Sequence, residues 1–115
     1  PWEDRTVPLP ELPPRCPSCG ALARPDVVWF GESLPGDALD AAFAAVRRSQ
    51  LMLVVGTSAL VNPAASLPLM ALERGAYVVE VNPHPTPLSA VVNDAIRQPA
   101  ADALPAWWRA WQAEG

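Results

Sequence analysis

Two short, almost wholly apolar runs dominate the pattern of hydrophobic and polar positions along the chain. Residues 51–55 are Leu-Met-Leu-Val-Val, and residues 76–81 are apolar except for Glu80. Short runs rich in β-branched residues predict strands, and the lack of alternation in residues 51–55 predicts burial on both faces of a sheet. Residues 26–30, Asp-Val-Val-Trp-Phe, predict a further strand that ends at Gly31.

The segments between and after these runs have the spacing of apolar residues that is typical of helices. Apolar residues recur three or four positions apart in residues 38–49, which predicts an amphipathic helix with Asp37 as its N-cap. Residues 64–74 predict a second helix closed by Gly75. Residues 102–112 predict a third helix, whose three tryptophans are expected to be packing anchors rather than a binding site.

The alternation of helices and strands predicts the fold class. Helix, strand, helix and strand in turn indicate parallel strands joined by crossovers on the faces of the sheet. We therefore expect an α/β fold, the second half of a Rossmann-type parallel sheet with helices on its faces. Half of such a sheet would leave one edge unpaired. The proline-rich residues 1–15 predict an extended arm, and residues 82–87 a rigid turn.

Composition narrows the classes of partner. The 115 residues are the size of one small domain, 50% are hydrophobic, and the net charge of −4 comes without a run of like charges. This excludes the basic patch that nucleic acids or a membrane surface usually demand. Residues 49–72 carry no charge, but Gly56 and two prolines argue against a membrane span. Two cysteines in one C-x-x-C favour a reducing, cytoplasmic setting.

The C-x-x-C at Cys16 and Cys19 offers two thiolates from one turn, which suits tetrahedral zinc. A structural site needs four ligands, and the usual spacing would put the other cysteine pair before residue 1. His84 is a conceivable third ligand. A redox pair or two idle thiols stay open as alternatives. We expect residues 1–24 to be the arm and half of a small zinc-binding module, and residues 25–115 to be the partial Rossmann-type domain.

Polar residues stand at the ends of both apolar runs. Gly56-Thr57-Ser58 follows the first run, and Asn82 follows the second. In open α/β sheets ligands bind beyond the carboxyl ends of the strands, where a glycine allows close approach and hydroxyl and amide groups hold phosphate or ribose oxygens. Each feature alone fits an ordinary turn. Together they favour a nucleotide site.

These motifs, in this order, resemble the sirtuin family over most of the chain. Residues 16–20 and 24–32 are similar to the family's second zinc pair and the strand that follows it. Residues 56–58 and 61–65 resemble its NAD loop and the adjoining helix start, and residues 80–82 resemble the strand end that meets the adenosine ribose.

The resemblance implies an NAD-dependent protein-lysine deacylase that acts on acyl-lysine proteins or peptides and releases nicotinamide and O-acyl-ADP-ribose, with NAD and zinc bound. The positions that would contact NAD are Gly56, Thr57, Ser58, Asn82, Pro83, His84 and Ala100. The positions that would hold the substrate backbone as an added strand are Val28, Gly31, Glu32 and Val61. Cys16 and Cys19 would supply two of four zinc ligands. Gln98 stands where the family usually has glycine, and Phe30 fits either a core or an acyl tunnel.

Three family features do not occur in these residues: the glycine-rich first turn, the Gln-Asn pair and the catalytic histidine followed by glycine. The one histidine, His84, matches the adenosine side instead. We expect a C-terminal segment with no catalytic residue of its own, inactive alone and partnered by an N-terminal half. The alternatives are a non-catalytic ADP-ribose or nucleotide-binding module and a zinc-stabilised interaction domain.

Overall fold

The computed structural model of the chain describes residues 2–114. It divides into two compact units, Pro1–Pro35 and Gly36–Gly115. This division lies further along the chain than the expected boundary between residues 24 and 25. Among the helices of residues 2–114, none combines the length and the apolar character that spanning a lipid bilayer requires.

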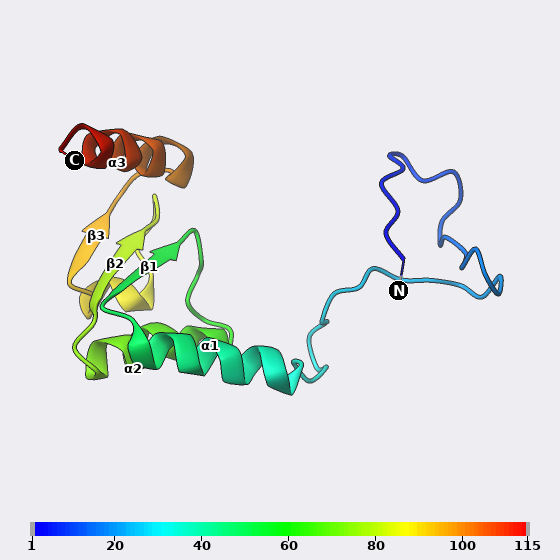
Figure 1. The fold of residues 1–115 in the computed structure, drawn as a ribbon, viewed down its shortest axis with the longest axis horizontal. Helices are drawn as coiled ribbons and strands as arrows, with labels where there is room; N and C mark the ends of the chain where they lie inside the picture. Colours follow the sequence, from blue (N-terminus) through cyan, green and yellow to red (C-terminus); the bar gives the residue numbers. More distant parts are fainter. Residues whose placement is uncertain (1, 115) are drawn as a thin grey trace. The chain divides into compact units, whose positions relative to one another are not determined.

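The second unit is built on a parallel three-stranded sheet in the order β1-β2-β3 (Figure 1). The strands are β1 (Leu51–Val55), β2 (Tyr77–Val81) and β3 (Asp94–Ile96). Leu53 is paired with Val79, and Val55 with Val81. The two strands predicted from apolar runs and their parallel pairing are confirmed. Strand β3 was not predicted, because it has three residues and begins with a polar aspartate.

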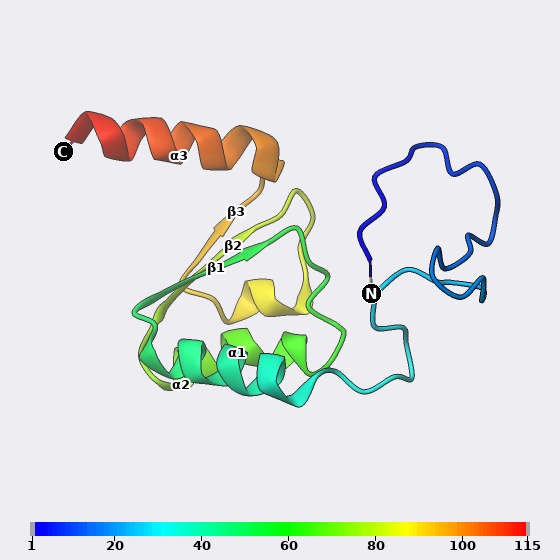
Figure 2. The same cartoon turned by 45° about the vertical axis from the view of Figure 1, so that its right-hand side comes forward.

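Helices lie on both faces of this parallel sheet, so the α/β class is confirmed. The helical elements are α1 (Gly36–Arg48), η1 (Ala64–Ser66), α2 (Leu67–Glu73), η2 (Pro87–Ala90) and α3 (Ala100–Glu114). Helices α1 and α2 lie on one face and α3 on the other, as both views show (Figures 1 and 2).

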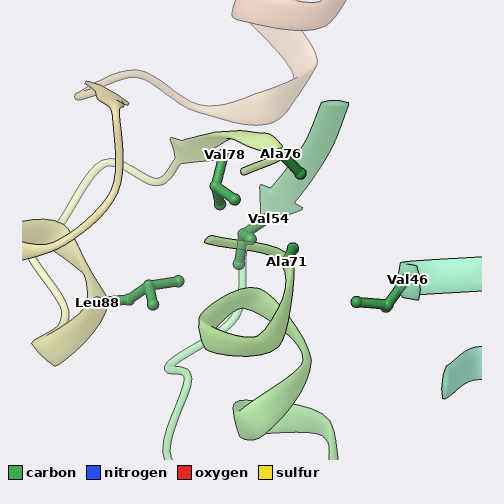
Figure 3. Close-up of a cluster of buried hydrophobic side chains, with 6 residues drawn as sticks. All are labelled: Val46, Val54, Ala71, Ala76, Val78 and Leu88. Carbon is green, nitrogen blue, oxygen red and sulfur yellow. The ribbon is translucent and has the colours of Figure 1, made fainter. Parts of the chain in front are cut away.

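The alternation of side chains along the strands produces two small apolar cores. The cluster on the α1–α2 face is shown in Figure 3 and consists of Val46, Val54, Ala71, Ala76, Val78 and Leu88. On the other face Val79 and Val81 pack against Ala103 of α3. Because neighbouring residues of β2 enter opposite clusters, this strand is buried on both sides and holds the two layers together.

Strand β1 differs from its prediction. We expected burial on both faces, but Leu51, Leu53 and Val55 are 57%, 42% and 38% exposed. Met52 and Val54 face the α1–α2 cluster, whereas the alternate side chains of β1 have no helix above them in the described residues. Strand β1 is also an edge of the sheet, as expected for half of a doubly wound fold.

Two helix boundaries differ from the prediction for local reasons. Asp37 was expected to cap the first helix, but α1 already begins at Gly36, and Asp37 lies in its first turn. The helix predicted for residues 64–74 is divided into η1 and α2. The buried Pro68 lies in the first turn of α2, where its lack of an N–H costs no helical hydrogen bond. Gly75 follows α2 at φ +82°, which confirms the predicted glycine stop.

The tryptophans of α3 are not packing anchors in the described residues. Trp107, Trp108 and Trp111 are 37%, 57% and 66% exposed. Trp108 and Trp111 lie against each other, with ring centroids 5.0 Å apart. The start of α3 is held by the core, through Ala100, Ala103 and Leu104.

The first unit contains no strand or helix within residues 2–35. The strand predicted for residues 26–30 is wrong: these residues form irregular backbone and the start of a turn. β-Branched and aromatic residues favour a strand only where a neighbouring strand completes the hydrogen-bond ladder. The described part of this unit has one isolated antiparallel bridge, between Arg15 and Leu22, and that bridge does not reach residues 26–30.

Candidate functional site

The carboxyl ends of the three strands form one rim of the sheet, and the predicted nucleotide residues begin there. Gly56 follows β1 with φ +64°, and its N–H donates to the Val81 carbonyl oxygen at 2.9 Å. A Cβ atom placed on Gly56 would meet nothing within 4 Å. The backbone of Gly56 is therefore open to a ligand, and its left-handed conformation disfavours any residue with a side chain.

Hydrogen bonds join the loops after β1 and β2. Asn82 donates from Nδ2 to the Thr57 carbonyl oxygen at 3.0 Å, while its Oδ1 accepts from the His84 N–H at 3.1 Å. Thr57 Oγ1 accepts from the N–H of Ala59 at 3.1 Å. The structure thus brings Gly56, Thr57, Asn82 and His84 together, which the sequence could only place at neighbouring strand ends.

The other predicted nucleotide positions lie in these two loops and at the start of α3. The side chains of Ser58, Pro83 and His84 are exposed. Ala100 begins α3 on the same rim, and its methyl group packs against the cluster around Val81. Ala100 is half-buried, so its backbone and part of its methyl group face the rim. Open backbone at Gly56, an exposed hydroxyl and a helix start match what phosphate and ribose oxygens require.

An apolar cavity of about 310 Å³ lies beside the rim, against β1. Its lining residues are Met52, Leu53, Val54, Val55, Thr57, Val61, Ala64, Ala65, Leu67 and Pro68. Thr57 is the only polar residue among them. The cavity therefore runs along β1 as far as Thr57, in the loop that follows this strand.

In the first unit, the predicted substrate residues belong to a turn fixed by an ion pair. Arg24 donates from Nη1 and Nη2 to the two carboxylate oxygens of Glu32, at 2.9 and 3.1 Å. Oε2 of Glu32 also accepts from the Trp29 N–H at 3.0 Å. These hydrogen bonds, first that from Arg24 and then that from Trp29, lower the pKa of Glu32. The Arg24 guanidinium also lies 5.6 Å from the centre of the Trp29 ring.

This turn changes how Glu32 is interpreted. Both carboxylate oxygens of Glu32 already accept hydrogen bonds within the turn. Its N–H also donates to the Trp29 carbonyl oxygen, at 3.0 Å. Its side chain therefore shapes the turn. Val28 and Gly31 are exposed, as is Val61 in the second unit. Phe30 is 90% exposed, so it is not a core residue in the described part of the chain.

The C-x-x-C forms a tight turn. The N–H of Cys16 donates to the Ala21 carbonyl oxygen at 2.8 Å, and the N–H of Gly20 donates to the Cys16 carbonyl oxygen at 2.9 Å. The backbone N–H groups of Ser18 and Cys19 lower the pKa of the Cys16 thiol, which favours the thiolate that metals bind. No group of three or more His, Cys, Asp or Glu side chains that could hold a metal occurs within residues 2–114. The structure therefore brings no further ligand to the two cysteines within these residues.

Sequence reasoning missed one polar cluster under the rim. Glu80 is 1% exposed, and its carboxylate accepts hydrogen bonds from Thr86 and Ser89 and an ion-pair contact from Arg97. The available signal was a single glutamate inside an otherwise apolar strand, because a buried charge requires partners.

Comparison with known proteins identifies the family. The model of the Sir2 family matches residues 3–63. NAD-dependent protein deacylase 1 of Caldanaerobacter subterraneus is 60% identical over 75% of this chain and 36% of its own length. The NAD-dependent protein deacylase of Aquifex aeolicus is 52% identical over 86% of this chain and 41% of its own length. This chain therefore spans about two fifths of these relatives.

Solved structures show the same similarity. A Sir2 homologue in complex with NAD superimposes with a TM-score of 0.89 at 42% identity, covering 98% of this chain and 44% of that one. Sir2Tm bound to a propionylated peptide superimposes with a TM-score of 0.72 at 37% identity, covering 89% of this chain and 42% of that one. Since the family model matches more than half of the sequence, and a solved Sir2 homologue shares the fold, the chain belongs to the Sir2 family, the sirtuins.

Proposed function

We propose that this chain is the C-terminal part of an NAD-dependent protein-lysine deacylase. The observation that carries the proposal is the hydrogen bond from Asn82 to the Thr57 carbonyl oxygen, which joins two strand-end loops into one rim. A rim of this kind is where open α/β sheets bind nucleotides. The relatives named as NAD-dependent protein deacylases, and the Sir2 homologue solved with NAD, support the same assignment.

The NAD-binding residues proposed from the rim are Gly56, Thr57, Ser58, Asn82, Pro83, His84 and Ala100. The exposed hydroxyl of Ser58 and the open backbone of Gly56 suit the phosphate and ribose oxygens. Pro83, His84 and the start of α3 suit the adenosine side. In such a deacylase NAD supplies the ADP-ribose that accepts the acyl group, with release of nicotinamide and O-acyl-ADP-ribose.

The catalytic base is proposed to lie outside these 115 residues. His84 is the only histidine in the sequence, and its N–H is tied to Asn82 in the adenosine-side loop. We therefore propose that an N-terminal part outside these residues supplies the base and covers the exposed face and edge of β1, since the chain spans only about two fifths of its relatives. The isolated chain is then inactive.

The substrate proposed for the complete protein is an acyl-lysine protein or peptide. Val28, Gly31 and Val61 are exposed and can offer backbone groups to an extended peptide. Glu32, proposed with them, would act by holding the turn through its carboxylate, which is paired with Arg24, rather than by contacting the peptide with that carboxylate. The peptide complexes of Sir2 homologues support this class of substrate.

Zinc is proposed as the structural metal, with Cys16 and Cys19 supplying two thiolates. The other two ligands would come from the N-terminal part. The two free cysteines are consistent with the reducing, cytoplasmic setting that we propose.

Calorimetry on the complete protein tests the proposal. We expect saturable binding of NAD and of ADP-ribose, and weakening of both by Ser58→Ala. Binding of ADP-ribose without any deacylation of an acyl-lysine peptide would favour the alternative of a non-catalytic nucleotide module. Absence of binding to either ligand would contradict a nucleotide site at this rim.

A further inference from the structure

The inference concerns Glu80, the one charged residue that is buried in the described part of the chain, at 1% exposure. It lies near the end of β2, two residues before Asn82. A carboxylate in an apolar layer carries a large desolvation penalty, which must be offset by hydrogen bonds and opposite charge. Its partners show where that compensation comes from.

Three donors converge on the two carboxylate oxygens. The hydroxyl of Thr86 donates to Oε1, the hydroxyl of Ser89 donates to Oε2 at 2.5 Å, and Arg97 Nη1 lies 2.8 Å from Oε2. Burial on its own would raise the pKa of Glu80, but the hydrogen bonds from Ser89, Thr86 and Arg97 outweigh it and leave the pKa lowered. Glu80 is therefore a carboxylate in this fold.

The two hydroxyl groups also hold the turn itself. Thr86 Oγ1 accepts from the Leu88 N–H at 3.2 Å, and Ser89 Oγ accepts from the Thr86 N–H at 2.8 Å, forming a capping box at η2. Each hydroxyl has a single proton, and each proton is donated to Glu80. The end of the loop that follows β2 is thus fixed to the carboxylate.

Arg97 fixes the beginning of the same loop. The Nη1 atom that contacts Glu80 also donates to the Asn82 carbonyl oxygen at 3.3 Å. Asn82 in turn donates to the Thr57 carbonyl oxygen of the glycine loop. One buried carboxylate therefore holds both ends of residues 82–86 and connects them to Gly56-Thr57-Ser58.

We propose that Glu80 and Arg97 are positioning residues for NAD, which hold residues 82–86 in the conformation that binds the adenosine side. The inference rests on the proposed function. A buried ion pair contributes little net stability compared with apolar residues of the same size. What it provides is a fixed loop geometry, and a loop ordered before binding loses less entropy when the ligand arrives.

The test uses Glu80→Gln in the complete protein. Glutamine keeps the size of the side chain but turns an NH₂ group toward Arg97 or the hydroxyls. We expect the dissociation constant of ADP-ribose and the KM for NAD to rise about three- to tenfold, the equivalent of one ordinary hydrogen bond. We expect kcat at saturating NAD to stay within about twofold, because neither residue touches the reacting atoms.

Two further variants keep the test decisive. Glu73→Gln changes an exposed glutamate in α2 of the same unit and should leave both constants unchanged. Ser89→Ala removes one donor and leaves the ion pair in place, so it should give a smaller rise in the same constants even if Glu80→Gln does not fold.

The outcomes separate the two levels of the proposal. If the unsubstituted protein binds ADP-ribose, and Glu80→Gln and Ser89→Ala lower the melting temperature without weakening binding, Glu80 is only structural and the inference is wrong. A fall of about three- to tenfold in kcat at saturating NAD, as large as the expected rise in the KM, would also overturn the inference. If the unsubstituted protein binds neither NAD nor ADP-ribose, the proposed function itself fails first.

Discussion

Each unit of the chain contains one Arg–Glu pair that fixes a proposed binding turn, and the two pairs lie in opposite environments. In the pair of the second unit, the side chains of Glu80 and Arg97 are 1% and 34% exposed. In the pair of the first unit, the side chains of Arg24 and Glu32 are 56% and 43% exposed. Water screens an exposed pair and competes for its hydrogen bonds, so the same chemistry has different consequences in the two units.

The difference extends to everything around the pairs. Within residues 2–35 no side chain is buried, and the turn rests on local hydrogen bonds. The second unit has a core on each face of β2, and its rim stands on that core. We infer that the proposed nucleotide rim is set by this chain's own fold, whereas the turn at residues 29–32 and the C-x-x-C turn, with the peptide and zinc roles proposed for them, rest on local contacts alone.

The largest expected effect is the loss of the buried cation. Arg97→Ala leaves the carboxylate of Glu80 buried with two hydroxyl donors only, and should reduce the free energy of unfolding by about 2 to 3 kcal/mol. Chemical denaturation followed by circular dichroism measures it. The matched variant Arg24→Ala should leave the midpoint unchanged, because its partner stays solvated. Equal losses in the two variants would break the comparison.

A functional pair of variants sharpens the same contrast. Ser58→Ala removes a proposed hydrogen bond to a charged phosphate or to a ribose, and should raise the KM for NAD about ten- to hundredfold. Arg24→Ala should instead raise the KM for the acyl-lysine peptide, because it releases the turn at residues 29–32. Steady-state kinetics on the complete protein measure both constants. A Ser58→Ala enzyme with an unchanged NAD dependence would remove Ser58 from the site.

The buried carboxylate of Glu80 should make the free energy of unfolding depend on pH in the acidic range. The folded-state pKa of Glu80 is lowered from its ordinary value of 4.5, so Glu80 contributes stability above about pH 4.5 that is lost as the pH falls through the folded pKa. The unfolding free energy of Glu80→Gln should therefore fall less steeply in this acidic range than that of the unsubstituted chain. The pKa of Glu32 is lowered as well, but water screens its pair with Arg24, so the curve of Glu32→Gln should depart less from the unsubstituted one. Superimposable curves for all three would show that Glu80 is not ionised in the fold.

The smallest expected effect belongs to the only histidine. His84 is exposed and held through its backbone, so His84→Ala in the complete protein should leave kcat nearly unchanged at saturating NAD. At most the KM for NAD should rise. A large fall in kcat at saturating NAD would place the catalytic base in this chain.

The same contrast explains how far the sequence could predict the structure. Residues 51–55 and 76–81 were predicted correctly as strands, because each finds a neighbouring strand to pair with inside the second unit. The strand predicted for residues 26–30 failed, since its propensity needs a partner strand that residues 2–35 do not offer. The predicted burial of one face of β1 and of the tryptophans in α3 was wrong for a related reason. The apolar character of a side chain does not specify which element, if any, covers that side chain.

The candidate site was predictable in its chemistry but not in its connections. The glycine loop and Asn82 could be placed at neighbouring strand ends, because parallel strands end at the same rim. The hydrogen bond between them, and the convergence of Thr86, Ser89 and Arg97 on Glu80, depend on loop conformations that no periodicity encodes. The occupied carboxylate of Glu32 was equally invisible, since it depends on a turn that brings Arg24 alongside.

The central claim, that this chain carries the nucleotide rim of a deacylase and not its catalytic base, is tested most directly by nicotinamide release. The assay supplies NAD and an acyl-lysine peptide to the 115 residues alone and to the complete protein. We predict NAD-dependent release by the complete protein and none by the 115 residues. Turnover by the 115 residues alone, or none by the complete protein, would contradict the account.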